Sequence, residues 1–175
     1  MPTPDRTSFR AIVDAGRDVL EEGGLSRLTM QSVAERVGVR APSLYKRVRD
    51  RDALVSAVVA ATIECLADRL EASDLSLEGL AHAYRAFALD RPEGFRLIFS
   101  TAAPQAALDR ASIAILDTAR ALVGDAQALE AARLVTAWAT GFVQMELAGA
   151  FQLGGDLDEA FSFGISTLRR GLQSI

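Results

Sequence analysis

Hydrophobic residues recur at every third or fourth position through most of the chain, which is the spacing of one face of an α-helix. The first such segment carries Phe9, Ile12, Val13, Val19 and Leu20. The pair Gly23-Gly24 follows it and predicts the end of that helix, since glycine readily adopts the left-handed conformation of a C-terminal cap. We find no segment in which apolar and polar residues alternate between turn signals, as in a strand. The pattern predicts an all-α fold of about nine helices.

Two short helices joined by a tight turn come next. Thr29 is placed to cap the first of them, and Gly38 supplies the sharp exit from it. Pro42 falls in the first turn of the second helix, where its missing N–H costs no hydrogen bond. Asp50 then caps a long helix that is expected to run to about Ser73.

Five further helices are predicted in the rest of the chain. Their first residues or caps are Leu77, Pro92, Pro104, Asp125 and Asp156. Gly124 and the pair Gly154-Gly155 are expected to separate the last three of these helices. Small residues in the last two would allow a close approach between helices: Ala137, Gly141, Ala148, Gly149 and Gly164.

Charge is distributed unevenly along the chain. The net charge of -4 would by itself disfavour nucleic acid as a partner. Residues 1–54, however, carry ten Lys and Arg against eight Asp and Glu, and the rest carries nine against fifteen. Within residues 36–51 six basic side chains are opposed only by Asp50. This short basic segment fits the requirements of B-DNA, whose phosphates attract cations and whose major groove admits one helix.

The basic segment also resembles the TetR family of regulators. The resemblance lies in residues 28–54, which read LTMQSVAERVGVRAPSLYKRVRDRDAL, and extends over roughly residues 7–58. Val48 stands where many members have phenylalanine, and Arg51 stands where lysine is usual. The resemblance implies a helix-turn-helix DNA-binding domain in residues 1–50 and a helical domain for ligand binding and dimerisation in residues 51–175.

Chemistry assigns two kinds of DNA contact to this segment. Arg40 and Lys46 are the residues best able to bond guanine edges, and Ala41 and Pro42 offer apolar contact to thymine methyl groups. Phosphate contacts, which fix register without reading sequence, are expected from Thr29, Gln31, Ser43, Tyr45, Arg47 and Arg51. Thr29 could equally serve only as a helix cap. Arg36 and Arg49 are expected to be solvated charges, and Leu44 and Val48 are expected to be core residues.

The resemblance implies a homodimer formed through the last two helices, with a palindromic DNA operator as its partner. A small apolar ligand is expected in a cavity lined by Phe87, Phe95, Phe99, Ile115, Trp138, Phe142 and Met145. These side chains could equally be plain core. A repressor released by the ligand is the expectation from the family, and the residues do not distinguish repression from activation. Glu146 interrupts an apolar helix, and a polar anchor in a pocket or an interface is one interpretation that the sequence does not decide.

The sequence contains no constellation of residues typical of an enzyme. We find no nucleophile with a base and no phosphate-binding glycine loop, and Cys65 with His82 cannot complete a structural zinc site. No cofactor and no metal are expected. The first ten residues lead into no apolar signal core and no long apolar run follows, so the expected location is the cytoplasm. The alternative interpretation is a helical ligand-binding or protein-interaction module that does not bind an operator.

Overall fold

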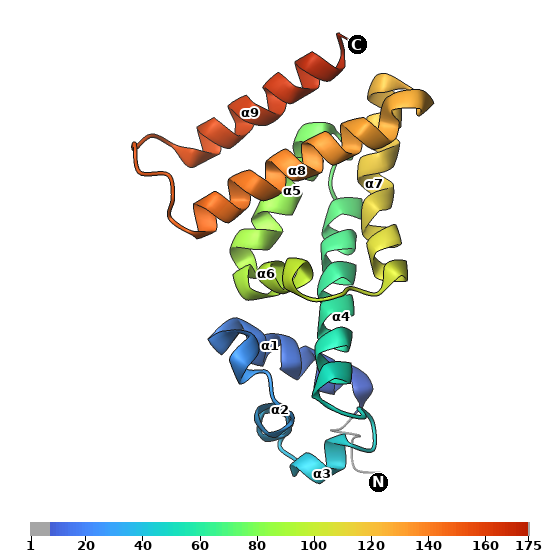
Figure 1. The fold of residues 1–175 in the computed structure, drawn as a ribbon, viewed down its shortest axis with the longest axis vertical. Coiled ribbons are helices and arrows are strands. Elements are labelled where there is room, and N and C mark those ends of the chain that lie inside the picture. Colours follow the sequence, from blue (N-terminus) through green and yellow to red (C-terminus); the bar gives the residue numbers. More distant parts are fainter. Residues whose placement is uncertain (1–7, 175) are drawn as a thin grey trace. The chain divides into compact units, whose positions relative to one another are not determined.

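A computed structural model describes residues 8–174. Most of the first ten residues, in which we found no signal core, lie outside this range. The prediction of an all-α fold is confirmed: over the described residues there are nine α-helices, one short 3-10 helix and no strand (Figure 1). The helices are α1 (Phe9–Arg27), α2 (Met30–Val37), α3 (Ala41–Leu44), α4 (Arg51–Glu71), α5 (Leu77–Asp90), α6 (Pro92–Ser100), α7 (Gln105–Val123), η1 (Asp125–Gln127), α8 (Ala128–Leu147) and α9 (Leu157–Leu172).

The chain divides into two compact units. Unit 1 contains the residues up to Cys65 together with Arg91–Leu108, and unit 2 contains Leu66–Asp90 and Asp109–Ile175. Helix α4 therefore contributes to both units, and α6 belongs to unit 1 although it follows α5 in the chain. The boundary that we placed at residue 50 stays a prediction about function.

Unit 1 is built on the apolar face of α1. Ser8 caps this helix by accepting a hydrogen bond from the backbone N–H of Ala11 at 3.1 Å. Gly16 faces α4, where a Cβ on this glycine would lie 2.8 Å from a methyl group of Val58. Glycine at this position therefore lets α1 and α4 approach closely. The side chains buried on α1 include Ile12, Val13, Val19 and Leu20, as the periodicity predicts.

The end predicted for the first helix is a break within α1. Gly23 and Gly24 have non-helical backbone angles, and Gly24 has a φ of +69°. A further turn continues to Arg27 beyond the break. The glycine pair thus interrupts the helix where the sequence indicates, and residues 25–27 add a turn that the periodicity did not predict.

Unit 1 also holds the N-terminus of α6. The carboxylate of Glu21 on α1 accepts hydrogen bonds from the backbone N–H groups of Glu93 and Gly94, at 3.1 and 2.8 Å. A side chain thereby satisfies two of the N–H groups that a helix start leaves without partners. This contact ties α6 to α1 within the unit.

In unit 2, helices α5, α8 and α9 pack around the buried ring of Phe161. Trp138 and Phe142 on α8 lie with their ring centroids 5.1 Å from that of Phe161. Gly164 on α9 permits this packing, because a Cβ there would stand 2.1 Å from the Trp138 ring. The close approach that Gly164 allows is therefore between two helices of the same chain.

The ends of α8 and α9 follow the expected local chemistry. Asp156 caps α9 by accepting from the N–H groups of Asp158 and Glu159, at 2.7 and 3.2 Å. Helix α8 ends at Leu147, so two of the small residues predicted in it, Ala148 and Gly149, lie beyond its end, and Gly149 has a φ of +62°. Among residues 8–174, no helix is both long enough and apolar enough to cross a membrane.

Candidate nucleic-acid interface

The geometry of α2 is fixed by its two ends. The Thr29 hydroxyl oxygen accepts a hydrogen bond from the Ser32 N–H at 3.1 Å, and the Thr29 and Ser32 hydroxyl groups lie 2.6 Å apart. At the other end Gly38 has a φ of +73°, and its N–H bonds to the carbonyl groups of Ala34 and Glu35. The Thr29 cap and the glycine turn predicted from the sequence are both present.

Two buried side chains orient α3 and the turn after it. Leu44 and Val48 are 0% and 3% exposed, and they anchor one side of this segment in unit 1. Pro42 lies in the first turn of α3, as predicted, and Arg40 precedes the helix in an extended conformation. The opposite side of the segment, with Tyr45 at 55% exposure, faces outward.

Arg40 and Lys46 are the two cations that this arrangement leaves available. Both side chains are exposed, and neither makes a hydrogen bond or ion pair with any residue in the described part of the chain. Arg47 is also exposed and has a contact of its own within the chain. Exposed guanidinium and ammonium groups without partners are suited to bind phosphates or base edges without first breaking a contact.

Arg36 and Arg49, which are expected from the sequence to be solvated charges, form ion pairs at the surface. Arg36 donates to Glu22 at 2.5 Å, and Arg49 donates to Asp50 at 2.6 Å. The hydrogen bond that Arg36 donates to Glu22 is the main reason that the pKa of Arg36 is raised, and the hydrogen bond to Asp50 raises the pKa of Arg49 in the same way. Their charge is therefore partly balanced within the chain.

Arg51 has a role that the sequence did not reveal. Its guanidinium donates to the backbone carbonyl groups of Leu28 and Leu25, at 2.8 and 2.7 Å. It thereby ties the start of α4 to the chain that leads into α2. Its partners are backbone oxygens more than twenty residues earlier, so no side-chain pattern could have indicated them. The phosphate contact predicted for Arg51 stays a prediction.

The remaining predicted DNA contacts lie on the same two helices. Ala41 and Ser43 are half-buried on α3, and Gln31 is exposed near the start of α2. The Gln31 amide donates to the carboxylate of Glu35 at 2.6 Å, one helical turn further on. A phosphate contact from Gln31 would have to compete with this hydrogen bond.

Side chains predicted to bind a ligand are spread over both units. Phe95 and Phe99 lie in unit 1 on α6, with ring centroids 5.3 Å apart. In unit 2, Trp138 and Phe142 belong to the aromatic cluster around Phe161, and Met145 on α8 is 47% exposed. Phe87 is fully buried in unit 2, and Ile115 on α7 is half-buried.

Two family models match the chain. The model described as bacterial regulatory proteins, tetR family, matches residues 12–58, which contain α2 and α3. The model described as tetracyclin repressor-like, C-terminal domain, matches residues 77–168, more than half of the chain. The chain belongs to the TetR family.

Similarity to TetR proteins extends over nearly the whole chain. The tetracycline repressor protein class A from transposon 1721 of Escherichia coli is 31% identical over 159 residues, covering 85% of this chain and 73% of that protein. An uncharacterized HTH-type transcriptional regulator of Bacillus subtilis (strain 168), YobS, is 25% identical, with 93% and 91% covered. The structure of a possible TetR family transcriptional regulator from Streptomyces coelicolor A3(2) is 25% identical and superposes with a TM-score of 0.74, covering 95% of this chain and 99% of that one.

Proposed function

We propose that this TetR family member is a homodimeric transcriptional repressor that binds a palindromic operator in the cytoplasm and leaves it when a small apolar ligand binds. The observation that carries the DNA-binding part is the pair Arg40 and Lys46, exposed cations just before and just after α3 that lack partners within the described residues. Arginine bonds guanine O6 and N7 together, which makes Arg40 the main candidate for reading sequence.

Other residues of the two helices would position the protein on the duplex. Ser43, Tyr45 and Arg47 lie on or just after α3, where hydroxyl and guanidinium groups can reach phosphates. Thr29 and Gln31 lie at the start of α2, whose N-terminal dipole favours a phosphate. Ala41 and Pro42 would contact thymine methyl groups in the major groove.

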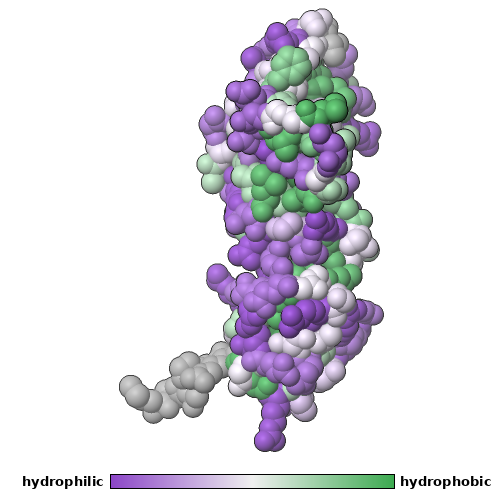
Figure 2. All heavy atoms as spheres, turned by 90° about the vertical axis from the view of Figure 1, so that its left-hand side faces the viewer, coloured by the Kyte–Doolittle hydropathy of each residue, from purple (hydrophilic) through white to green (hydrophobic). Residues whose placement is uncertain are grey.

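An exposed apolar surface on α8 and α9 supports the homodimer. Leu134 and Met145 on α8 are 48% and 47% exposed, and Phe163 on α9 is 69% exposed. Figure 2 shows apolar side chains, in green, gathered on the upper half of the face that it draws. Gly141 on α8 has no atom within 4 Å of the position of an added Cβ, so a partner helix could approach it closely. Two copies would present their α3 helices to successive major grooves, about 34 Å apart.

Ligand release requires a difference in affinity between two states of the dimer. Helix α4 contributes residues to both units and could carry a change from unit 2 to the DNA-binding helices. Moving such an equilibrium from 1:99 to 99:1 takes about 5.5 kcal/mol of differential binding. The buried Phe87 and the cluster of Trp138 and Phe142 would have to rearrange to admit a ligand.

Operator binding by point variants tests this function. Arg40→Ala should weaken binding by about 1–3 kcal/mol and relax the preference at one base position. Arg120→Ala is the matched control, since it also removes one exposed guanidinium but lies on α7 in unit 2. Equal losses for both variants, or a loss for Arg40→Ala that is the same on every sequence, would contradict the assignment of Arg40 to base reading.

The dimer is tested separately by sedimentation of the full chain. Gly141→Leu should shift the equilibrium toward monomer, because it fills the space that a partner helix would need. Gly171→Leu adds the same side chain on α9, where an added Cβ also meets no atom of the chain within 4 Å. This second variant tests the other helix of the proposed interface. A chain that sediments as a monomer at every concentration would contradict the homodimer.

A further inference from the structure

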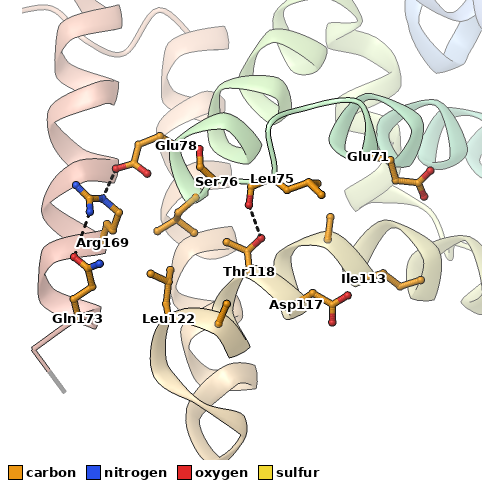
Figure 3. Close-up of a pocket in the computed structure, with 13 residues that line it drawn as sticks. Glu71, Leu75, Ser76, Glu78, Ile113, Asp117, Thr118, Leu122, Arg169 and Gln173 are labelled. Carbon is orange, nitrogen blue, oxygen red and sulfur yellow. Dashed lines mark hydrogen bonds and ion pairs between the residues drawn. The ribbon is translucent and has the colours of Figure 1, made fainter.

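A groove with apolar walls opens on unit 2, between the end of α4, the α4–α5 loop, α7 and the last turns of α9 (Figure 3). Its volume is about 820 Å³, within the range of small-molecule sites. The apolar lining comes from Leu75, Leu77, Ile113, Ala114, Ala121 and Leu122. None of the seven residues predicted to bind a ligand lines this groove.

One wall of the groove is held in a costly backbone conformation. Leu75 has a φ of +58°, the one positive φ at a residue other than glycine in the described chain. Ser73 accepts a hydrogen bond from its N–H at 3.3 Å, and the Thr118 hydroxyl donates to its carbonyl at 3.0 Å. The loop is thus fixed on both sides, while the Leu75 side chain stays 50% exposed along the groove. Such conformations persist where the surroundings enforce them, and here they preform an apolar wall.

Carboxylates outnumber cations around the groove. Glu71, Glu78 and Asp117 line it against one cation, Arg169, which already donates to Glu78 at 2.5 Å and to Gln173 at 3.3 Å. Glu71 and Asp117 are each paired with an arginine that does not line the groove, and each of these arginines also pairs with a second acidic residue. Arg110 is shared by Glu71 and Asp68, and Arg120 by Asp117 and Asp125.

We propose that this groove binds an amphipathic organic cation. Its apolar body would lie along Leu75 and Ile113, and its charged head would lie by Glu71 and Asp117, which Figure 3 shows at the same end of the groove as Ile113. An anionic head would instead have to separate Arg169 from Glu78 at the other end. Unit 2 carries thirteen acidic and seven basic residues, which disfavours an anion further.

The test compares three eight-carbon probes on the full chain: octyltrimethylammonium, octanol and octanoate, each below its aggregation concentration. Titration calorimetry without DNA should give saturable one-site binding for the ammonium probe, weaker binding for octanol and none for octanoate. The assay contains no DNA, so its outcome is independent of the proposed regulatory function. Equal binding of all three probes, or no binding of the ammonium probe, would overturn the proposal.

Two variants locate the binding site. The double variant Glu71→Gln, Asp117→Asn should weaken the ammonium probe about fivefold per carboxylate, the effect of a unit charge about 4 Å away in water, and should leave octanol unchanged. The pair Glu130→Gln, Glu159→Gln removes the same charge from residues that do not line the groove and should have little effect. An equal loss in both double variants would show attraction to the whole unit and would overturn the site.

Filling the groove provides a second, steric test. Ala114→Trp places an indole among the apolar lining and should abolish binding of the ammonium probe. Ala126→Trp, on the exposed η1 helix outside the groove, adds the same side chain and should retain it. Thermal unfolding of both variants checks that they are folded. Retained binding in a folded Ala114→Trp variant would overturn the proposal.

Discussion

The guanidinium of Arg85 donates one hydrogen bond to each carboxylate oxygen of Glu146, at 2.7 and 2.6 Å. The two side chains are 8% and 12% exposed, so the ion pair is largely shielded from water. Arg85 also donates to Asp158 at 2.6 Å and lies 5.2 Å from the centre of the Phe161 ring. Glu146 is thus the polar anchor of a contact that joins α5, α8 and α9, and its hydrogen bond is the main cause of the raised pKa of Arg85.

Removing one partner of this ion pair should be costly. Arg85→Ala leaves the Glu146 carboxylate buried without a partner, and we expect a loss of about 3–5 kcal/mol in the free energy of unfolding. Replacing both partners with leucine should recover much of that loss, since no charge is then left buried. Urea unfolding at neutral pH measures both. A loss below about 1 kcal/mol in Arg85→Ala, the range of an exposed pair, would contradict this role.

The contact between Gly164 and Trp138 makes a second prediction. An added Cβ at residue 164 would stand 2.1 Å from a rigid ring, so Gly164→Ala must separate α8 from α9 or displace the ring. We expect a loss of about 1–3 kcal/mol. Gly171→Ala is the matched control on the same helix, because its Cβ would meet no atom within 4 Å. The control should be neutral or up to about 1 kcal/mol more stable. Equal unfolding midpoints for the two variants would contradict the account.

The raised pKa of the Tyr84 hydroxyl predicts a loss of stability at high pH. Burial raises its pKa from 10.0 to about 12, and the hydrogen bond with Thr140, at 2.7 Å, offsets part of this rise. Between these values the unfolded chain loses the phenol proton while the folded chain keeps it. The contribution of Tyr84 is therefore complete below pH 10 and lost as the pH rises to about 12, by about 2 kcal/mol.

Urea unfolding at pH 9 and pH 11 measures this loss. Tyr84→Phe should show a smaller decrease between the two pH values than the unmodified chain. Tyr45→Phe removes the exposed tyrosine and should keep the full decrease. Equal losses of stability in Tyr84→Phe and the unmodified chain over this interval would contradict this role of Tyr84.

Arg51 should contribute to stability as well as to DNA binding. Arg51→Ala removes the guanidinium donor from the carbonyl groups of Leu28 and Leu25, and among the described residues the latter keeps only the Leu28 N–H at 3.3 Å. We expect about 1–2 kcal/mol lower stability. If Arg51 also contacts a phosphate, the variant will weaken binding to all duplexes alike and reduce the salt dependence. Arg51→Lys, the residue usual in the family, should retain the charge and part of the stability. Unchanged unfolding of Arg51→Ala would contradict the structural role.

The fold was predictable wherever local chemistry decides it. Thr29, Asp50 and Asp156 cap the helices that follow them, and Asp50 does so by accepting from the Ala53 N–H at 2.8 Å. Gly38 adopts the positive φ that the turn between α2 and α3 requires. Each of these signals lies within about five residues of the feature that it sets, so the sequence alone contains it.

Contacts between distant segments could not be predicted in this way. Arg51 bonds to backbone carbonyls, and Glu21 caps a helix that begins 71 residues later, at Pro92. Aromatic residues at helical spacing have the same pattern in a core as in a ligand cavity. The structure places Trp138 in an aromatic cluster, and the groove lined by Leu75 carries none of the predicted ligand residues. Side-chain chemistry already indicated Arg40 and Lys46 from the sequence, and the structure adds that neither side chain has a partner among the described residues.

The most direct test of the account is selection of bound DNA from random duplexes by the full chain over a range of salt concentrations. We predict enrichment of a palindrome whose half-sites lie about one helical turn apart, or a multiple of it, with binding that falls steeply as salt rises. Lys46→Ala should reduce that salt dependence by about one phosphate contact or relax one base position. Failure to enrich any sequence, with weak binding even at low salt, would contradict the account and favour a helical module that does not bind an operator.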